Sequence, residues 1–302
     1  MAQTAPTAGP IVGIDTIPQR PNAFLQFIKA QPLGFVGLLI IILYFVFAFG
    51  AQWIAPYDPE AVDFAAMLTG PGLEHLFGTD QYGRDVFSRL VYGSRTALGV
   101  GIISALVGCT LGAVLGAGSG YFGGRIDNII QAVVDIMLSF PLIVLAMVIV
   151  AVLGKQTVMG IDMNLVAAIA IPMIPRMARI ARSSALSISQ MPYIDAARAA
   201  GYSHLRIIVR HILPNIIAPY LIMTTAFIAQ AILLEASLSF LGLGVTEPTP
   251  AWGLMLSGTS ADFYKAAPWM ILFPGLAITL AVFAFNLLGD SLRDWLDPKM
   301  KG

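Results

Sequence analysis

The sequence predicts an all-α membrane protein with six transmembrane helices. Its 302 residues are 57% hydrophobic and only 11% charged, with a mean hydropathy of +0.80. A soluble domain typically carries about 25% charged residues, so this chain is too apolar for one. Six apolar runs approach the ~20 residues that a helix needs to cross a bilayer. They lack the period-two alternation of a barrel strand, which favours helices whose backbone hydrogen bonds are satisfied internally.

The first apolar run covers residues 33–54 and follows a polar leader. A cleaved secretory signal has an apolar stretch of roughly 7–15 residues, so this longer run is expected to stay attached as an anchor. The remaining predicted spans are 96–119, 129–153, 165–185, 216–243 and 268–288.

The distribution of positive charge predicts the orientation of these spans. With both termini in the cytoplasm, 12 of the 17 Lys and Arg residues lie at or near the inner side. The others, on the outer side, are Arg84, Arg89, Arg95, Lys155 and Lys265. The positive-inside rule favours this arrangement. It divides the chain into a cytoplasmic leader (1–32), a first span with an extracytoplasmic loop (33–94), a five-helix core (95–292) and a cytoplasmic tail (293–302).

Composition also excludes several kinds of partner. The net charge is +0 and no long basic run occurs, so a nucleic-acid partner has no support. The single cysteine, Cys109, rules out an intrachain disulfide and a thiolate metal cluster. We interpret it as a small core residue.

The predicted outer loop ends in a short amphipathic stretch. Val86, Phe87, Leu90 and Val91 fall on one helical face, with charged and hydroxyl residues opposite. This pattern predicts either an interfacial helix on the outer leaflet or the water-exposed start of the second span.

Small residues recur at intervals of four in the second span. They are Ser104, Gly108, Gly112, Gly116 and Gly120. Residues spaced by four share a helical face, and small ones let another helix approach closely, so we expect a packing face rather than a pore lining.

The long inner loop, 186–215, has the pattern of two short helices. An alanine-rich segment follows Pro192, and Gly201 can end it in a left-handed conformation. Ser203 is a plausible N-cap for a second helix with Leu205, Ile208, Val209 and Ile212 on one face, before Pro214 interrupts it. On charge alone, such a loop could simply rest on anionic lipid through Arg198, Arg206 and Arg210.

The complete pattern of this loop resembles a known element. Asp195, two alanines, three residues, Gly201 and then Leu213-Pro214 at a fixed distance resemble the cytoplasmic coupling loop of ABC-importer permeases. That family usually has Glu at the position of Asp195. It commonly has isoleucine at the position of His211, and a histidine there resembles the peptide-permease branch.

Further segments resemble the C-type permease subunit of dipeptide, oligopeptide and nickel importers. They are Gly78-Thr79-Asp80 with Gly83-Arg84-Asp85, the stretch 235–244, and Gly289-Asp290, Arg293-Asp294 and Asp297-Pro298. The resemblance implies a type I ABC-importer permease fold in the bacterial inner membrane. It also implies a B-type permease as heterodimer partner, two cytoplasmic ATPase subunits and an extracytoplasmic solute-binding protein.

In that case the partner ATPases hydrolyse ATP with Mg, and this chain itself binds no cofactor or metal. Consistently, the sequence contains no G-x-x-x-x-G-K-[ST] nucleotide loop. The residues that the resemblance assigns to ATPase coupling are Asp195, Ala196, Ala197, Arg198, Ala200, Gly201, His204, Arg210, Leu213 and Pro214. The solute is expected to be a dipeptide or oligopeptide, with nickel chelates, opines or other small solutes as alternatives.

Asp135 and Glu235 are the acidic residues well inside the predicted spans, and Ser237 and Ser239 adjoin the second. A carboxylate at membrane depth must be partnered or wet, so these four residues either bond between helices or face the translocation path. Intramembrane acids are also typical of ion-coupled secondary transporters, which are the main rival class. A membrane enzyme has little support, because no H-E-x-x-H or nucleophile-elbow pattern occurs.

Overall fold

The computed structural model describes residues 28, 30–154, 156–158, 161–258, 262–263 and 265–296. Most of the predicted leader and tail, and Lys155, lie outside these residues. Within them, five helical segments are long and apolar enough to span a membrane: Pro32–Ile54, Val86–Phe122, Met163–Ser189, His204–Phe240 and Trp269–Leu296. The predicted all-helical class is confirmed.

The long segments comprise helices α2 (Pro32–Ile54), α3 (Val86–Phe122), α6 (Met163–Ala170), α7 (Ile174–Ser189), α10 (Ile217–Phe240) and α13 (Trp269–Leu296). Shorter helices are η1 (Phe64–Ala66), α8 (Pro192–Ala199), α9 (His204–Ile207) and α11 (Trp252–Met255). The strands β1 (Thr157–Val158) and β2 (Ile161–Asp162) form a small antiparallel hairpin.

The prediction of one continuous third span was wrong. Residues of this run form α4 (Gly124–Ser139) and α5 (Leu142–Leu153), which are bent by 96° at the break. Pro141 explains the break, since the residue before a proline is driven out of the helical region, and Phe140 has an extended backbone with φ −88° and ψ 138°. At about 1.5 Å per residue, α5 alone is too short to cross a bilayer. The pair is therefore a broken span or a re-entrant segment.

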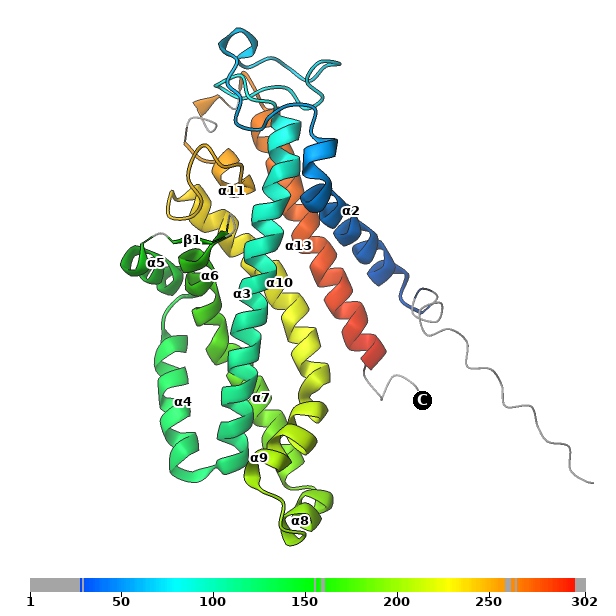
Figure 1. Ribbon diagram of the computed structural model, residues 1–302, viewed down its shortest axis with the longest axis vertical. Helices are drawn as coiled ribbons and strands as arrows, with labels where there is room; N and C mark the ends of the chain where they lie inside the picture. The colour runs from blue at the N-terminus through cyan, green and yellow to red at the C-terminus, as the bar shows by residue number, and fades with distance from the viewer. Residues whose placement is uncertain are drawn as a thin grey trace, which may run out of the picture.

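Helix α3 forms the centre of the molecule, as Figure 1 shows, and packs against α7, α10, α2 and α6. The loop between α2 and α3 covers one end of the bundle, which we call the loop end. Helix α8 projects at the opposite end, which we call the α8 end. Arg84 precedes α3 and Arg89 and Arg95 belong to its first turns, next to the α2–α3 loop, whereas Arg198 belongs to α8 and Arg206 to α9. This separation matches the predicted charge asymmetry.

The small-residue face of α3 packs against the α6–α7 segment in a regular ladder. A methyl group built at Gly108, Gly112, Gly116 or Gly120 would lie 2.1–2.8 Å from the carbonyl oxygens of Ala170, Ile174, Ala178 and Arg182, respectively. Ser104 continues the series by donating a hydrogen bond to the Val166 carbonyl at 3.2 Å. On each helix the contacting residues are four positions apart, so the two backbones stay in contact over four turns. The packing interpretation of this face is confirmed.

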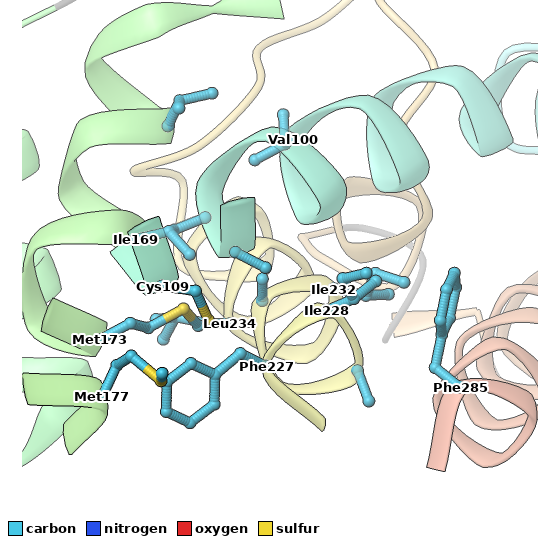
Figure 2. Close-up of a cluster of buried hydrophobic side chains, with 14 of the residues drawn as sticks. Val100, Cys109, Ile169, Met173, Met177, Phe227, Ile228, Ile232, Leu234 and Phe285 are labelled. Atoms are coloured by element: carbon cyan, nitrogen blue, oxygen red, sulfur yellow. The ribbon is translucent and has the colours of Figure 1, made fainter. Parts of the chain in front are cut away.

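Apolar side chains fill the space between α3, the α6–α7 segment and α10. Figure 2 shows Met173 and Met177 beside Phe227, with Cys109 close to Ile169. Cys109 is fully buried in this cluster, as expected of a core residue. Such packing holds the three helices together along the length of α3.

The stretch 86–91 forms no separate interfacial helix. It is the first turns of α3, whose N-cap Asp85 accepts a hydrogen bond from the Ser88 backbone N–H at 2.7 Å. Val86 and Val91 are fully buried against other parts of the protein. The alternative that this stretch begins the second span is therefore supported, but its expected exposure to water is wrong, because Val86, Leu90 and Val91 are covered by protein.

The prolines of the fourth span produce a local change rather than a break. Pro172 lies in the 3₁₀ turn η2 (Ile171–Met173), and Pro175 lies at the start of α7. Residues Met163–Ser189 still form one candidate span of 27 residues. The prolines fall where a missing N–H is tolerated, because each stands near the start of a helical segment.

Candidate functional site

The segment at the α8 end has the two-part form expected from its sequence. Helix α8 starts at Pro192 and ends before Gly201, which has φ +79°. The Gly201 N–H bonds to the Arg198 carbonyl at 3.0 Å, and the Tyr202 N–H bonds to the Ala197 carbonyl at 3.1 Å. These are the two bonds of a Schellman motif, which needs a left-handed residue at the position of Gly201. The predicted role of Gly201 as a helix terminator is confirmed.

One face of α8 is buried against the rest of the protein and the other face is exposed. Ile194 and Ala197 are buried, whereas Asp195, Ala196 and Arg198 are exposed. Arg198 donates a hydrogen bond to Asp195 at 3.1 Å on this outer face. The exposed face therefore presents small residues and one ion pair to solvent or to another protein.

The second helix begins as predicted but continues differently. The Ser203 hydroxyl accepts from the Arg206 N–H at 3.4 Å and caps α9. The chain then passes through a π-helical turn, η3 (Ile208–Ile212), and a 3₁₀ turn, η4 (Leu213–Ile216), into α10. Pro214 lies in that 3₁₀ turn and does not separate the segment from α10.

The predicted apolar face of this helix was wrong for Leu205 and Val209 and right for Ile212. Ile207, Ile212 and Ile216 are buried, whereas Leu205 is 71% and Val209 55% exposed. A π-turn accommodates five residues, so it brings Ile207 and Ile212 to the same side and turns Leu205 and Val209 outward. An α-helical periodicity could not show this shift.

Aromatic contacts fasten this segment to the end of α3. The Tyr121 hydroxyl lies 2.9 Å from Nδ1 of His204, and the Arg198 guanidinium lies over the Tyr121 ring at 5.5 Å from its centroid. His211 lies between the rings of Tyr193 and Tyr202, and no described group hydrogen-bonds its buried Nε2. The resemblance assigned His204 to ATPase coupling and used His211 only as a mark of the peptide-permease branch, and it assigned nothing to Tyr121, whose position depends on the turn between α3 and α4.

The four polar residues assigned to the membrane interior lie in two separate places, one on α4 and three on α10. Asp135 on α4 forms an ion pair with Arg179 on α7, and both side chains are exposed. Glu235 on α10 is fully buried and accepts a hydrogen bond from Ser239 at 2.7 Å, with no described partner for its other oxygen. The Ser237 hydroxyl donates to the Leu233 carbonyl of its own helix, at 2.7 Å.

A second interhelical ion pair was missed from the sequence. Arg182 on α7 donates to both oxygens of Asp127 on α4, at 2.6 and 2.5 Å. The Ser119 hydroxyl of α3 also donates to Asp127, at 2.5 Å. Asp127 lies before the predicted start of the third span. The hydropathy therefore did not show that it belongs to a helix packed against α7.

A charged cluster joins two loops at the loop end. Arg84 donates to Asp80 at 2.6 Å and to Glu247 at 2.5 Å, and the buried Arg89 donates to Glu247 at 3.4 Å. Partial burial raises the pKa of the Glu247 carboxyl, but the hydrogen bond from Arg84 and the charges of both arginines outweigh it. The pKa therefore lies below its usual value. The segment Gly78–Asp85 contributed to the family resemblance, whereas Glu247, more than 150 residues away, was not singled out from the sequence.

Comparison with known proteins identifies the family. Residues 108–302 match the model of the "Binding-protein-dependent transport system inner membrane component" family, and residues 23–71 match the "N-terminal TM domain of oligopeptide transport permease C". The chain belongs to the binding-protein-dependent inner-membrane permease family.

Relatives and a solved structure agree with this assignment. The permease is 42% identical over 301 residues to the "Glutathione transport system permease protein GsiD" of Escherichia coli O6:K15:H31, covering 99% of this chain and 97% of the relative. The protein of the same name from Shigella boydii serotype 4 shows the same identity and coverage. The inward-facing MetNI methionine ABC transporter resembles it in fold, with a TM-score of 0.50 and 17% identity over 70% of this chain and 97% of the other.

The permease is therefore a multi-pass inner-membrane subunit of an ABC importer of the peptide-transport type, with the type I permease fold. The predicted fold class and importer function are both confirmed.

Proposed function

We propose that this permease forms half of the import path for short peptides. Its 42% identical relatives are named as glutathione transport permeases, and glutathione is a small peptide. In this proposal a B-type permease completes the path, and an extracytoplasmic binding protein delivers the peptide to the loop end. Two ATPase subunits at the α8 end hydrolyse ATP with Mg, and this chain contributes no nucleotide site of its own.

The observation that carries the coupling part of the proposal is the exposed outer face of α8. Its exposed residues include Asp195, Ala196 and Arg198, and Leu205 on α9 and Val209 in η3 are also exposed. Apolar side chains exposed beside small and charged ones are typical of a protein contact surface. The buried Ile194 and the contacts of Tyr121 join the segment to α3, so movement of a docked partner would be transmitted to the bundle.

ATP-driven rearrangement of the ATPases would then switch the path between inward-open and outward-open states. ATP can bias this equilibrium only as far as the ATPases bind one permease state more tightly than the other. Both termini are cytoplasmic in this arrangement, and the loop end faces outward.

Substitution of Gly201 tests the docking proposal. A Cβ atom at this position would meet no other atom of the described chain within 4 Å, so within the permease the substitution acts through the backbone conformation. Gly201→Val requires a β-branched residue at φ +79°, with a strain of about 1–3 kcal/mol, and would re-aim α8. We expect normal membrane insertion but weaker ATPase co-purification, or ATP hydrolysis uncoupled from uptake.

Gly201→Asn is the matched control, because asparagine tolerates the left-handed region. It should retain most coupling. If the segment only rests on lipid, Gly201→Val has little effect, whereas neutralising Arg198, Arg206 and Arg210 together has a larger one. Full coupling in a well-expressed Gly201→Val variant would contradict the docking proposal.

The alternative that an ion gradient drives transport is tested directly. Vesicles containing the permease, its partner subunits and loaded binding protein should accumulate peptide only with internal ATP. Accumulation by the permease alone, driven by a proton or sodium gradient, would overturn the proposal. Offering nickel chelates or opines in place of the peptide tests the solute class.

A further inference from the structure

Arg176 places a positive charge at the middle of a membrane span. The charge count grouped it with the residues at or near the inner side, but it is the central residue of the 27-residue span Met163–Ser189, and its side chain is exposed on the surface of the chain. The hydrocarbon core is ~30 Å thick, so in a bilayer centred on this span either interface lies about 15 Å from Arg176, farther than an arginine side chain extends. Arg176 therefore cannot place its charge among lipid headgroups without thinning the bilayer.

Arg176 differs from the other arginines of α7. Arg179 pairs with Asp135 and Arg182 pairs with Asp127. Arg176 has no carboxylate within ion-pair distance among the described residues, and it donates one hydrogen bond, from Nη1 to Oε1 of Gln230 at 3.2 Å. An amide oxygen does not neutralise a guanidinium, so this charge lacks a counterion within the described chain.

The surroundings of Arg176 are also unusual for a membrane interior. It lines a small pocket at the break between α4 and α5, together with Met137, Phe140, Leu142 and Pro172. A helix broken by a proline in a membrane protein must lie against protein or a water-filled cavity. Transporters commonly bind their solutes beside such broken helices near the bilayer midplane. The break and the uncompensated charge are independent features that meet at one place.

We propose that Arg176 binds a carboxylate group of the solute as it passes through the permease, with Gln230 holding the guanidinium in position. A guanidinium presents two parallel N–H donors that match the two oxygens of a carboxylate. A peptide with a free C-terminal carboxylate supplies the missing counterion only while it is in the path. This inference rests on the proposed import function and names the chemical group that the path selects.

The experiment compares one dipeptide with its C-terminal amide. Both are supplied to vesicles that contain the complete importer, at concentrations that saturate the binding protein for each form. Arg176→Gln should lower uptake of the free dipeptide about tenfold or more, the effect of losing a charge-assisted hydrogen bond, while changing uptake of the amide little. Arg176→Lys should retain part of the preference, because it keeps the charge but not the two-donor geometry.

Two controls make the outcomes distinguishable. Arg293→Gln removes an exposed arginine at the far end of α13 and should leave both uptake rates unchanged. ATP hydrolysis stimulated by the loaded binding protein should remain in Arg176→Gln. If wild-type vesicles show no ATP-dependent uptake, the proposed function itself fails and not the role of Arg176.

Three results would overturn the inference. Equal loss of free dipeptide and amide would indicate that Arg176 only supports the helix break or the conformational change. Unchanged uptake of both would show that the charge is not used. Loss of the B-type permease during purification of Arg176→Gln would show that a carboxylate of that partner is the counterion.

Discussion

Gly116 of α3 and Ala178 of α7 approach so closely that a methyl group on Gly116 would lie 2.1 Å from the Ala178 carbonyl oxygen. The contact is between two backbones, so no side-chain rotation can relieve it. It lies in the middle of the ladder that joins α3 to the segment carrying Arg176 and leading to α8.

Gly116→Ala should destabilise the permease by about 1–3 kcal/mol, because the added methyl forces α3 and α7 apart. Gly118→Ala is the matched control, since a Cβ there meets no atom within 4 Å and the gain in helix propensity is the same. Thermal unfolding of the purified protein in detergent measures both. Similar unfolding temperatures for the two variants would show that the close approach is absent.

The cluster around Glu247 predicts a pH-dependent stability. The pKa of Glu247 is lowered in the folded protein, so its ionised carboxylate stabilises the loop end fully above the ordinary pKa of 4.5. This contribution is lost as the pH falls through the lower pKa of the folded state. Glu247→Gln should therefore unfold at a lower temperature than wild type at pH 7, and the difference should shrink as the pH falls below 4.5.

Unfolding can be followed by the fluorescence of Trp252 and Trp269, which both bond to the backbone near this cluster. Glu60→Gln is the control, as Glu60 is exposed on the loop between α2 and α3, at the same end of the bundle, and forms no ion pair with a described residue. A Glu247→Gln deficit that is the same at every pH would contradict an ionised Glu247 as its source.

Cysteine labelling tests the orientation. The native Cys109 is buried and should react little, which leaves an introduced cysteine as the main target. Leu73→Cys, at a fully exposed position of the loop end, should react with an impermeant thiol reagent added outside cells that lack the outer-membrane barrier. Asp294→Cys, at the end of α13, should react only after permeabilisation. Equal labelling of both in intact cells would contradict the six-span topology with cytoplasmic termini.

Local sequence features determined much of this protein. Apolar runs located the spans, because the length needed to cross a bilayer is a property of each segment by itself. The same is true of α8, whose end depends on Gly201 and its neighbours, and of the small-residue face of α3, which follows from spacing alone. The break at Phe140 also has a local cause in Pro141, although the continuous apolar run concealed it.

Only the tertiary structure decided which residues meet across the bundle. Arg84 and Glu247 are 163 residues apart, and no periodicity in either segment indicates their pairing. The sequence does not distinguish the arginines of α7 from one another. In the structure, Arg179 and Arg182 pair with acids on α4, whereas Arg176 bonds to Gln230 on α10. The π-turn Ile208–Ile212 likewise leaves Leu205 and Val209 exposed, although the α-helical pattern placed them on the buried face with Ile212. These outcomes depend on how neighbouring helices pack, and hydropathy averaged along one helix contains no information about its neighbours.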